Sequence, residues 1–111
     1  MPKPPYRLTK LAEVDYAEIL RFNGRRWGRE QLAVYRRLLN DGIEAVARKP
    51  DRLNSHDCDE LGPGFRSLHI GVVATHPGLG RHVLYYRVMA NGVVEILRIL
   101  HERMEASSKL P

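Results

Sequence analysis

The sequence lacks the features that would tie a small protein to an oxidising compartment or a membrane. Cys58 is the only cysteine, so no disulfide can form within the chain. The first residues contain no apolar core of a signal peptide, and no apolar run approaches the roughly 20 residues that cross a bilayer. We therefore expect a soluble, cytoplasmic protein that has no membrane partner.

Lysine is also scarce, although the chain is basic. The 18 Lys and Arg residues exceed the 13 Asp and Glu residues, which gives a net charge of +5, and lysine occurs only at positions 3, 10, 49 and 109. Arginine pairs with carboxylates or phosphates through two parallel hydrogen bonds. An acidic protein segment, a nucleic acid and an anionic membrane surface all fit this charge, so charge alone does not choose the partner.

The length of 111 residues, with 43% hydrophobic residues, is that of one compact domain over residues 1–111. A core of this size needs neither a disulfide nor a metal. His56, Asp57 and Cys58 lie together, but four ligands at a recognisable spacing are missing. We therefore assign no metal and no cofactor.

Two helices are predicted in the first half, after a short strand over residues 6–9. Thr9 stands at an N-cap position, so the first helix should begin near Lys10 and end between Gly24 and Gly28. The second follows a three-four apolar spacing and stops at Pro50. The positions predicted to face the core are Ala12, Tyr16, Ile19, Leu20 and Trp27, and then Leu32, Tyr35, Leu38, Leu39, Gly42, Ile43, Val46 and Ala47.

The second half changes to the period-two pattern of strands, after a polar and turn-rich stretch over residues 51–64. Strands are predicted over residues 65–73, 83–90 and 93–101. Asn91 and Gly92 form the strongest two-residue hairpin signal and place the last two strands antiparallel.

This order predicts an α+β fold in which a helical hairpin packs on a mainly antiparallel sheet (β-α-α-β-β-β). The last strand is apolar on both faces apart from Glu95 and Arg98, which is typical of a central strand. Its second face should therefore need cover, and in a chain with two helices that cover can come from another protein.

The segment from Val94 to Met104 closely resembles the closing strand of ParE toxins, in which an aliphatic strand runs into an Arg-Ile-Leu-His stretch. Other pieces resemble the same family in the same order: Tyr6–Thr9, Ala12 with Asp15 and Ile19, Tyr35–Leu39, Ile43–Pro50, Gly64–Arg66 before Leu68, and Tyr85–Val88. One departure is the Gly-rich connection Thr75–Arg81, where family members turn tightly; we interpret it as an extended hairpin turn. The chain thus resembles the RelE/ParE superfamily of type II toxin–antitoxin systems over nearly its whole length.

The resemblance implies a toxin that inhibits DNA gyrase by binding and carries no catalytic residue. It also implies a ParD-like antitoxin whose C-terminal segment wraps the toxin, in a complex of two toxins with two antitoxins or larger. An acidic wrapping segment would fit the positive charge. The antitoxin is expected to supply the DNA-binding element, so no direct DNA binding by this chain is expected.

Six residues are candidates for contacts with the antitoxin or the target: Arg66, Arg87, Arg98, His101, Arg103 and Trp27. Two of them have a structural alternative. Arg98 is more simply a packed cation that pairs with Glu95, Glu102 or a carboxylate from the helices. Trp27 is interpreted first as hairpin core, with an anchor for a partner as the alternative.

The RelE branch of the superfamily, which cuts mRNA on the ribosome, supplies the alternative function. If strand faces alternate, His69, Tyr85 and Arg87 share the sheet face away from the helices, and His101 approaches them from the last strand. Arginine would then stabilise a developing phosphorane charge while a histidine moves a proton. The lysine-rich segment that helps several ribonuclease members hold RNA is absent. Gyrase binding is therefore the preferred hypothesis.

Overall fold

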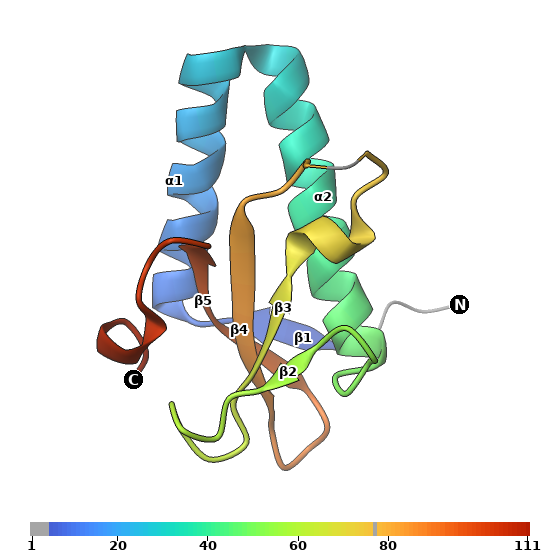
Figure 1. Cartoon of the computed structure of the whole chain (residues 1–111), viewed down its shortest axis with the longest axis vertical. Helices are drawn as coiled ribbons and strands as arrows, with labels where there is room; N and C mark the ends of the chain where they lie inside the picture. Colours follow the sequence, from blue (N-terminus) through green and yellow to red (C-terminus); the bar gives the residue numbers. More distant parts are fainter. Residues whose placement is uncertain (1–4, 77) are drawn as a thin grey trace.

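Two antiparallel helices stand against one face of a five-stranded sheet in the computed structural model, which describes residues 5–76 and 78–111 (Figure 1). The elements are β1 (Tyr6–Leu8), α1 (Lys10–Trp27), α2 (Arg29–Arg48), β2 (His56–Asp57), β3 (Arg66–His69), β4 (His82–Val88) and β5 (Val94–His101), with short 3-10 helices at Ile70–Val73 and Ala106–Ser108. The strand order is β1-β5-β4-β3-β2, and β1 runs parallel to β5 while the other neighbours are antiparallel. The predicted α+β fold is confirmed.

Thr9 starts α1 at the predicted position and also ties the helix to the sheet. Its hydroxyl oxygen accepts from the Ala12 amide at 3.1 Å, which caps the first turn. The same hydroxyl donates to the Leu97 carbonyl at 2.8 Å, and the Thr9 amide donates to the Ile96 carbonyl at 3.0 Å. Thr9 therefore continues the pairing along the edge of β5 where β1 ends.

The main core lies between the helical hairpin and the sheet. The predicted apolar stripe of α2 is confirmed: six of its positions are buried, and Leu32 and Ala47 pack on them from partly buried positions. The buried residues are Ala12, Ile19, Leu20, Tyr35, Leu38, Leu39, Ile43, Val46, Leu68, Ile70, Leu84, Tyr86, Val94, Ile96 and Ile99. Burial of this continuous apolar surface is the main force that holds the helices on the sheet.

The strand predicted over residues 65–73 is wrong in its second half, because β3 ends at His69 and a 3-10 helix follows. The His69 Nδ1 atom accepts from the Gly71 amide at 3.0 Å and so turns the backbone out of the sheet. Ile70 stays fully buried against α2, where a Cβ atom on Gly42 would lie 3.1 Å from its Cγ2 atom. The alternation of apolar residues therefore continued past the end of the strand without sheet pairing.

The expectation that another protein covers the second sheet face is also wrong where it concerns Leu97. This side chain is 2% exposed and packs with Cys58 and Phe65, beside Leu61 and Leu110. The turn after β2 and the C-terminal segment thus supply the cover from the chain itself. The sequence analysis described residues 51–64 only as a turn-rich connection and did not predict β2.

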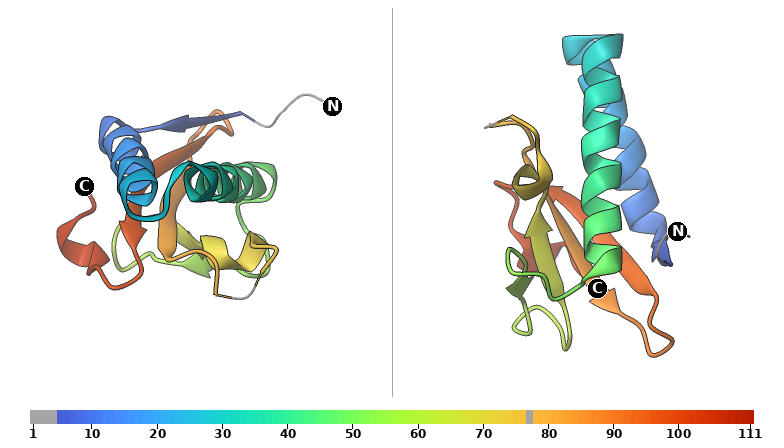
Figure 2. Two further views of the ribbon diagram at one scale, coloured as in Figure 1. Left: turned by 90° about the horizontal axis from the view of Figure 1, so that it is seen from above. Right: turned by 90° about the vertical axis from the view of Figure 1, so that its right-hand side faces the viewer.

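The helical hairpin extends beyond the sheet, as the two views of Figure 2 show. Helices α1 and α2 join through Gly28 alone, which ends one helix and begins the other. Its φ of 91° and ψ of 176° belong to a region that is open essentially to glycine alone. The far end of the hairpin therefore projects past the strands, and its inner side is not covered by the sheet.

The hairpin between β4 and β5 turns at Asn91 and Gly92, as predicted. The Met89 amide donates to the Val93 carbonyl at 2.8 Å, and Gly92 has a φ of 85°. The register shifts once between these strands, because Tyr85 lies opposite Arg98 and Tyr86 lies opposite Ile96. This leaves Leu97 as the extra residue of a β-bulge.

Candidate functional site

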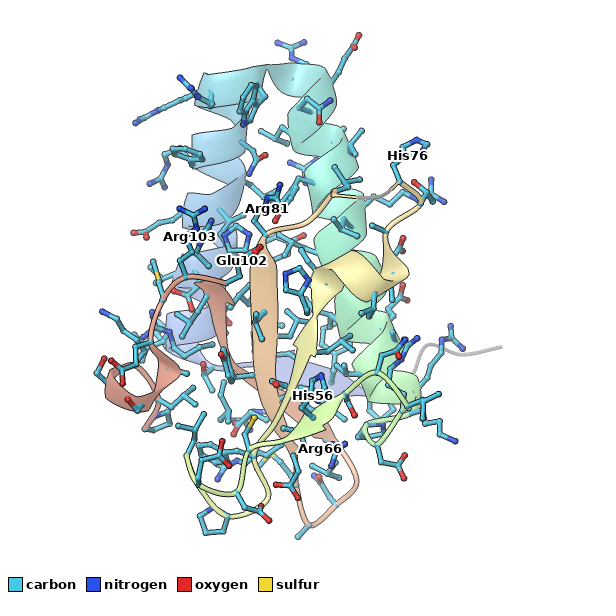
Figure 3. The ribbon with its side chains drawn as sticks, in the orientation of Figure 1. His56, Arg66, His76, Arg81, Glu102 and Arg103 are labelled. Carbon is cyan, nitrogen blue, oxygen red and sulfur yellow. The ribbon has the colours of Figure 1, made fainter. Side chains whose placement is uncertain are left out.

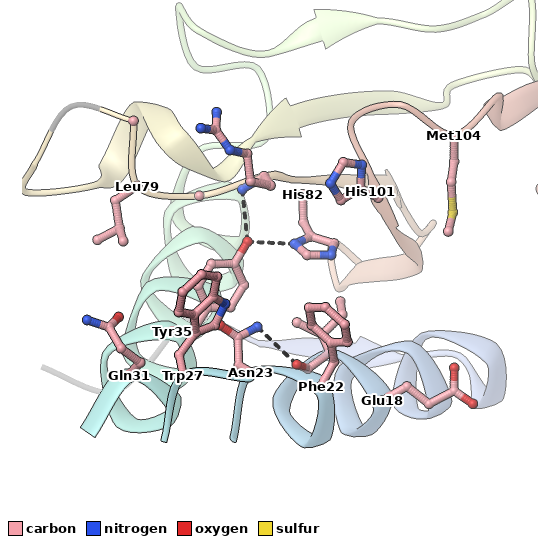
Figure 4. A pocket seen from close by; sticks show the side chains of 14 residues that line it. Glu18, Phe22, Asn23, Trp27, Gln31, Tyr35, Leu79, His82, His101 and Met104 are labelled. Carbon is pink, nitrogen blue, oxygen red and sulfur yellow. Dashed lines mark hydrogen bonds between the residues drawn. The ribbon is translucent and has the colours of Figure 1, made fainter. Parts of the chain in front are cut away.

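A groove of about 650 Å³ opens between the projecting end of the hairpin and the upper end of the sheet (Figure 4). We call it the hairpin groove. One wall comes from α1 and α2, and the other comes from the segment before β4 and the end of β5. Its lining residues are Glu18, Ile19, Phe22, Asn23, Trp27, Gln31, Tyr35, Gly78, Leu79, Gly80, Arg81, His82, His101 and Met104.

The rim of the hairpin groove carries large apolar side chains that stand in solvent. Phe22 is 64% exposed, Trp27 is 60% exposed and Met104 is 50% exposed. Single exposed apolar residues are ordinary, but three that line one groove are typical of an interaction site. The interpretation of Trp27 as hairpin core is wrong, since the helix ends beyond the reach of the sheet. Its ring instead lies 5.1 Å from the Arg26 guanidinium, a cation–π contact.

The floor of the groove is polar and fixed by hydrogen bonds. The Tyr35 oxygen accepts from the Arg81 amide at 2.9 Å, so its hydroxyl hydrogen is donated to the His82 Nδ1 atom, 2.5 Å away (Figure 4). Burial, followed by the nearby charge of His101, lowers the pKa of His82 to about 4. Burial raises the pKa of the Tyr35 hydroxyl. Both groups are therefore neutral at pH 7.

A second, smaller hollow of about 280 Å³ adjoins the groove and is lined by Arg81, His101, Glu102 and Arg103. We call it the basic depression. Figure 3 shows the labelled residues Arg81, Glu102 and Arg103 gathered at the upper end of the sheet. Glu102 Oε1 lies 3.4 Å from His69 Nε2 and 3.8 Å from the Arg81 guanidinium. Arg81 and His101 line both hollows, so the two are continuous.

The residues proposed for a ribonuclease do not gather at one place. His69 lies opposite Val83, and Val83, Tyr85 and Arg87 alternate along β4, which puts His69, Tyr85 and Arg87 on the outer sheet face as expected. His101 does not join them. It lies opposite His82 on the helix side, where the two ring centroids are 5.4 Å apart. The sheet therefore separates it from the other three.

Three of the six predicted contact residues are held by groups of the chain itself. Arg66 donates to the Pro50 carbonyl and the Ser55 hydroxyl, and Figure 3 shows it at the end of the sheet opposite to Arg81 and Arg103. Arg87 pairs with the buried Glu95 at 2.9 Å. Such pairs fix the sheet and leave few donors for a partner.

Arg98 forms the structural pair that its aliphatic neighbours suggested. It donates to both carboxylate oxygens of Asp15 on α1, each at 2.8 Å, and these bonds raise its pKa. Asp15 also accepts from the Ile99 amide at 3.0 Å, so one carboxylate holds the arginine and the free edge of β5.

The other three predicted contact residues, Trp27, His101 and Arg103, line the groove or the depression. The sequence analysis missed three of their neighbours, namely Phe22, Arg81 and Met104. Phe22 follows Ile19 by three positions and so continues the apolar face of α1 beyond the sheet. Arg81 gave no signal, because it ends a loop whose path the sequence does not specify.

Within residues 5–76 and 78–111, no helix is both long and apolar enough to cross a membrane. The same residues bring together no group of three or more His, Cys, Asp or Glu side chains that would hold a metal ion.

The model of the ParE toxin of the type II toxin–antitoxin system parDE matches residues 6–106. The chain belongs to the ParE toxin family. Toxin ParE1 of Caulobacter vibrioides is 37% identical over 106 residues, which cover 96% of this chain and 97% of that toxin. Toxin ParE1 of Mycobacterium tuberculosis is 34% identical over 105 residues, which cover 95% of this chain and 96% of that toxin. The whole ParE-like chain is therefore present in the match.

A solved structure of the same fold is the chromosomal ParDE toxin–antitoxin system of P. aeruginosa, with a TM-score of 0.69 and 16% identity over 89% of this chain and 96% of that chain. Family and relatives identify this chain as a ParE-family toxin of a type II toxin–antitoxin system. The ParE family supports a toxin that acts without catalysis.

Proposed function

We propose that this ParE-family toxin inhibits DNA gyrase by binding to it, and that a ParD-like antitoxin neutralises it by covering the hairpin groove. The observation that carries the proposal is the exposed apolar rim formed by Phe22, Trp27 and Met104. A soluble chain gains solubility and stability when a partner removes such a surface from water. The ParDE structure of P. aeruginosa, which shares this fold, is described as a toxin–antitoxin system.

The placement of the acid–base residues favours binding over RNA cleavage. A ribonuclease of the RelE kind needs a proton-transfer group and a phosphate-stabilising cation within reach of the same phosphate. Here His101 lies across the sheet from Tyr85 and Arg87, and the Arg87 guanidinium is already paired with Glu95. The ribosome-dependent ribonuclease therefore remains the second candidate.

The target is tested with the purified chain and DNA gyrase. We expect loss of supercoiling or accumulation of cleaved DNA, and we expect both effects to disappear when the antitoxin is added. The opposite pattern would refute gyrase binding: an unaffected gyrase together with cleavage of ribosome-bound mRNA that depends on His101 or Tyr85.

Antitoxin docking is tested separately with Phe22→Ala. The side chain is mostly exposed, so its removal should leave the fold intact while it weakens binding of the antitoxin by about tenfold or more. Leu11→Ala is the matched control, because Leu11 is an exposed apolar residue of α1 that is 51% exposed and lies outside the groove. Equal affinities for the two variants would remove the groove from the antitoxin interface. The mass of the complex would also show whether two toxins bind two antitoxins.

A further inference from the structure

The basic depression and the hairpin groove form one continuous surface with two different chemistries. The groove offers the apolar side chains of Phe22, Trp27 and Met104, while the depression offers two arginines against one glutamate. A ligand that fills both must be apolar along most of its length and negatively charged at the end that reaches Arg81 and Arg103. This combination is narrower than a general attraction between a basic toxin and an acidic partner.

The depression has hydrogen-bond donors that the chain does not use. The Arg81 side chain is 62% exposed and its nearest carboxylate, Glu102, is 3.8 Å away, beyond the range of a good hydrogen bond. The Arg103 side chain forms no ion pair or hydrogen bond with the described residues, although its backbone amide donates to the His101 Nδ1 atom at 3.2 Å. A neutral imidazole that accepts at Nδ1 carries its proton on Nε2. His101 therefore has a donor left at Nε2.

These donors match a carboxylate, which has two oxygens and accepts up to four hydrogen bonds. Glu102 does not fill this role, since it lies nearer to His69 than to Arg81. The rigid floor also helps, because Arg81 is fixed through its amide by Tyr35 and His101 packs edge-on against His82. Donors held in place bind with a smaller loss of conformational freedom than mobile ones.

We propose that the hairpin groove and the basic depression form a single binding site for an acidic amphipathic segment of the antitoxin. The apolar residues of the segment lie against Phe22, Trp27 and Met104, and one carboxylate binds in the depression between Arg81, His101 and Arg103. This inference rests on the proposed antitoxin function and adds the charged anchor that sets which partners fit.

The experiment measures the affinity of the full toxin for the full-length antitoxin encoded by the reading frame next to the toxin gene. Arg81→Ala and Arg103→Ala should each weaken binding by about tenfold, and the double variant by about a hundredfold. Arg37→Ala is the matched control, because Arg37 is an exposed arginine on α2 that lines neither hollow. The dependence of affinity on salt should also become shallower in the double variant than in the control.

A pair of substitutions at His101 tests the donor itself. His101→Gln keeps an N–H group near the position of Nε2 and should bind close to normally, whereas His101→Phe keeps the ring shape, lacks the donor and should bind more weakly. Binding that depends on Phe22 but is unchanged by Arg81→Ala and Arg103→Ala would overturn the charged anchor and leave the antitoxin proposal in place. Absence of any binding to the antitoxin would overturn both.

Discussion

The pair formed by Asp15 and Arg98 gives the most direct test of how this fold is held together. The Asp15 carboxylate accepts two charge-assisted bonds from Arg98 at 2.8 Å and one bond from the Ile99 amide at 3.0 Å. The two side chains are 11% and 17% exposed, so water cannot easily replace these bonds. Replacement by alanine removes all three at once.

The expected cost follows from these contacts. Removal of one partner from a buried ion pair costs about 3–5 kcal/mol, and a buried amide without its acceptor adds about 1 kcal/mol or more. The remaining exposure lowers the first figure, so we expect Asp15→Ala to reduce the free energy of unfolding by about 3 kcal/mol. At roughly 4 °C per kcal/mol for a chain of this size, the melting temperature should fall by about 12 °C.

Urea and thermal unfolding measure this loss. Asp15→Asn keeps an acceptor for the Ile99 amide and should lose about half as much. Asp41→Ala removes an exposed carboxylate of α2 and should change stability by less than about 0.5 kcal/mol. If Asp15→Ala proves no more harmful than Asp41→Ala, the pair does not join α1 to β5 in solution and the reasoning fails.

Three further predictions concern the groove and its floor. Tyr35→Phe leaves the Arg81 amide without its acceptor and His82 Nδ1 without its donor, so urea unfolding should show a loss of about 2 kcal/mol, against less than about 1 for the exposed Tyr16→Phe. Stability should also fall as the pH drops from about 6.5 toward about 4, because His82 of the unfolded chain takes up a proton in this window while the folded chain takes it up only near pH 4; a His82→Gln variant with an equally steep decline would contradict this. Trp27, the only tryptophan, should be open to acrylamide quenching in the free chain and protected in the antitoxin complex, and equal quenching in both would place it outside the interface.

The sequence predicted those parts of the fold that local patterns determine. The apolar spacing of α2, the Thr9 cap and the Asn91-Gly92 turn each depend on residues that are close in the chain, and the structure confirms all three. The 3-10 helix after β3 was missed because Ile70 and Val73 satisfy a strand pattern equally well. Only contact with α2, a distant element, decides between the two.

The candidate site was less predictable, because it forms where three separate segments meet. His101, Arg103 and Trp27 were recognised by residue type alone. Phe22 and Arg81 became visible only when the length of the helical hairpin relative to the sheet was known. The split of His101 from Tyr85 follows from the strand register, which a single sequence does not specify.

The single-residue link at Gly28 has a consequence for how partners fit this toxin. With no loop between α1 and α2, the far wall of the groove has no slack that would let it open or narrow for different ligands. Most of the adaptation in such a complex must then come from the incoming chain, which orders itself against a preset surface. Insertions between the helices would disturb that surface, whereas the connection over residues 75–81 has a length that related toxins can vary, so changes of antitoxin preference should accumulate there sooner than at the helical tip.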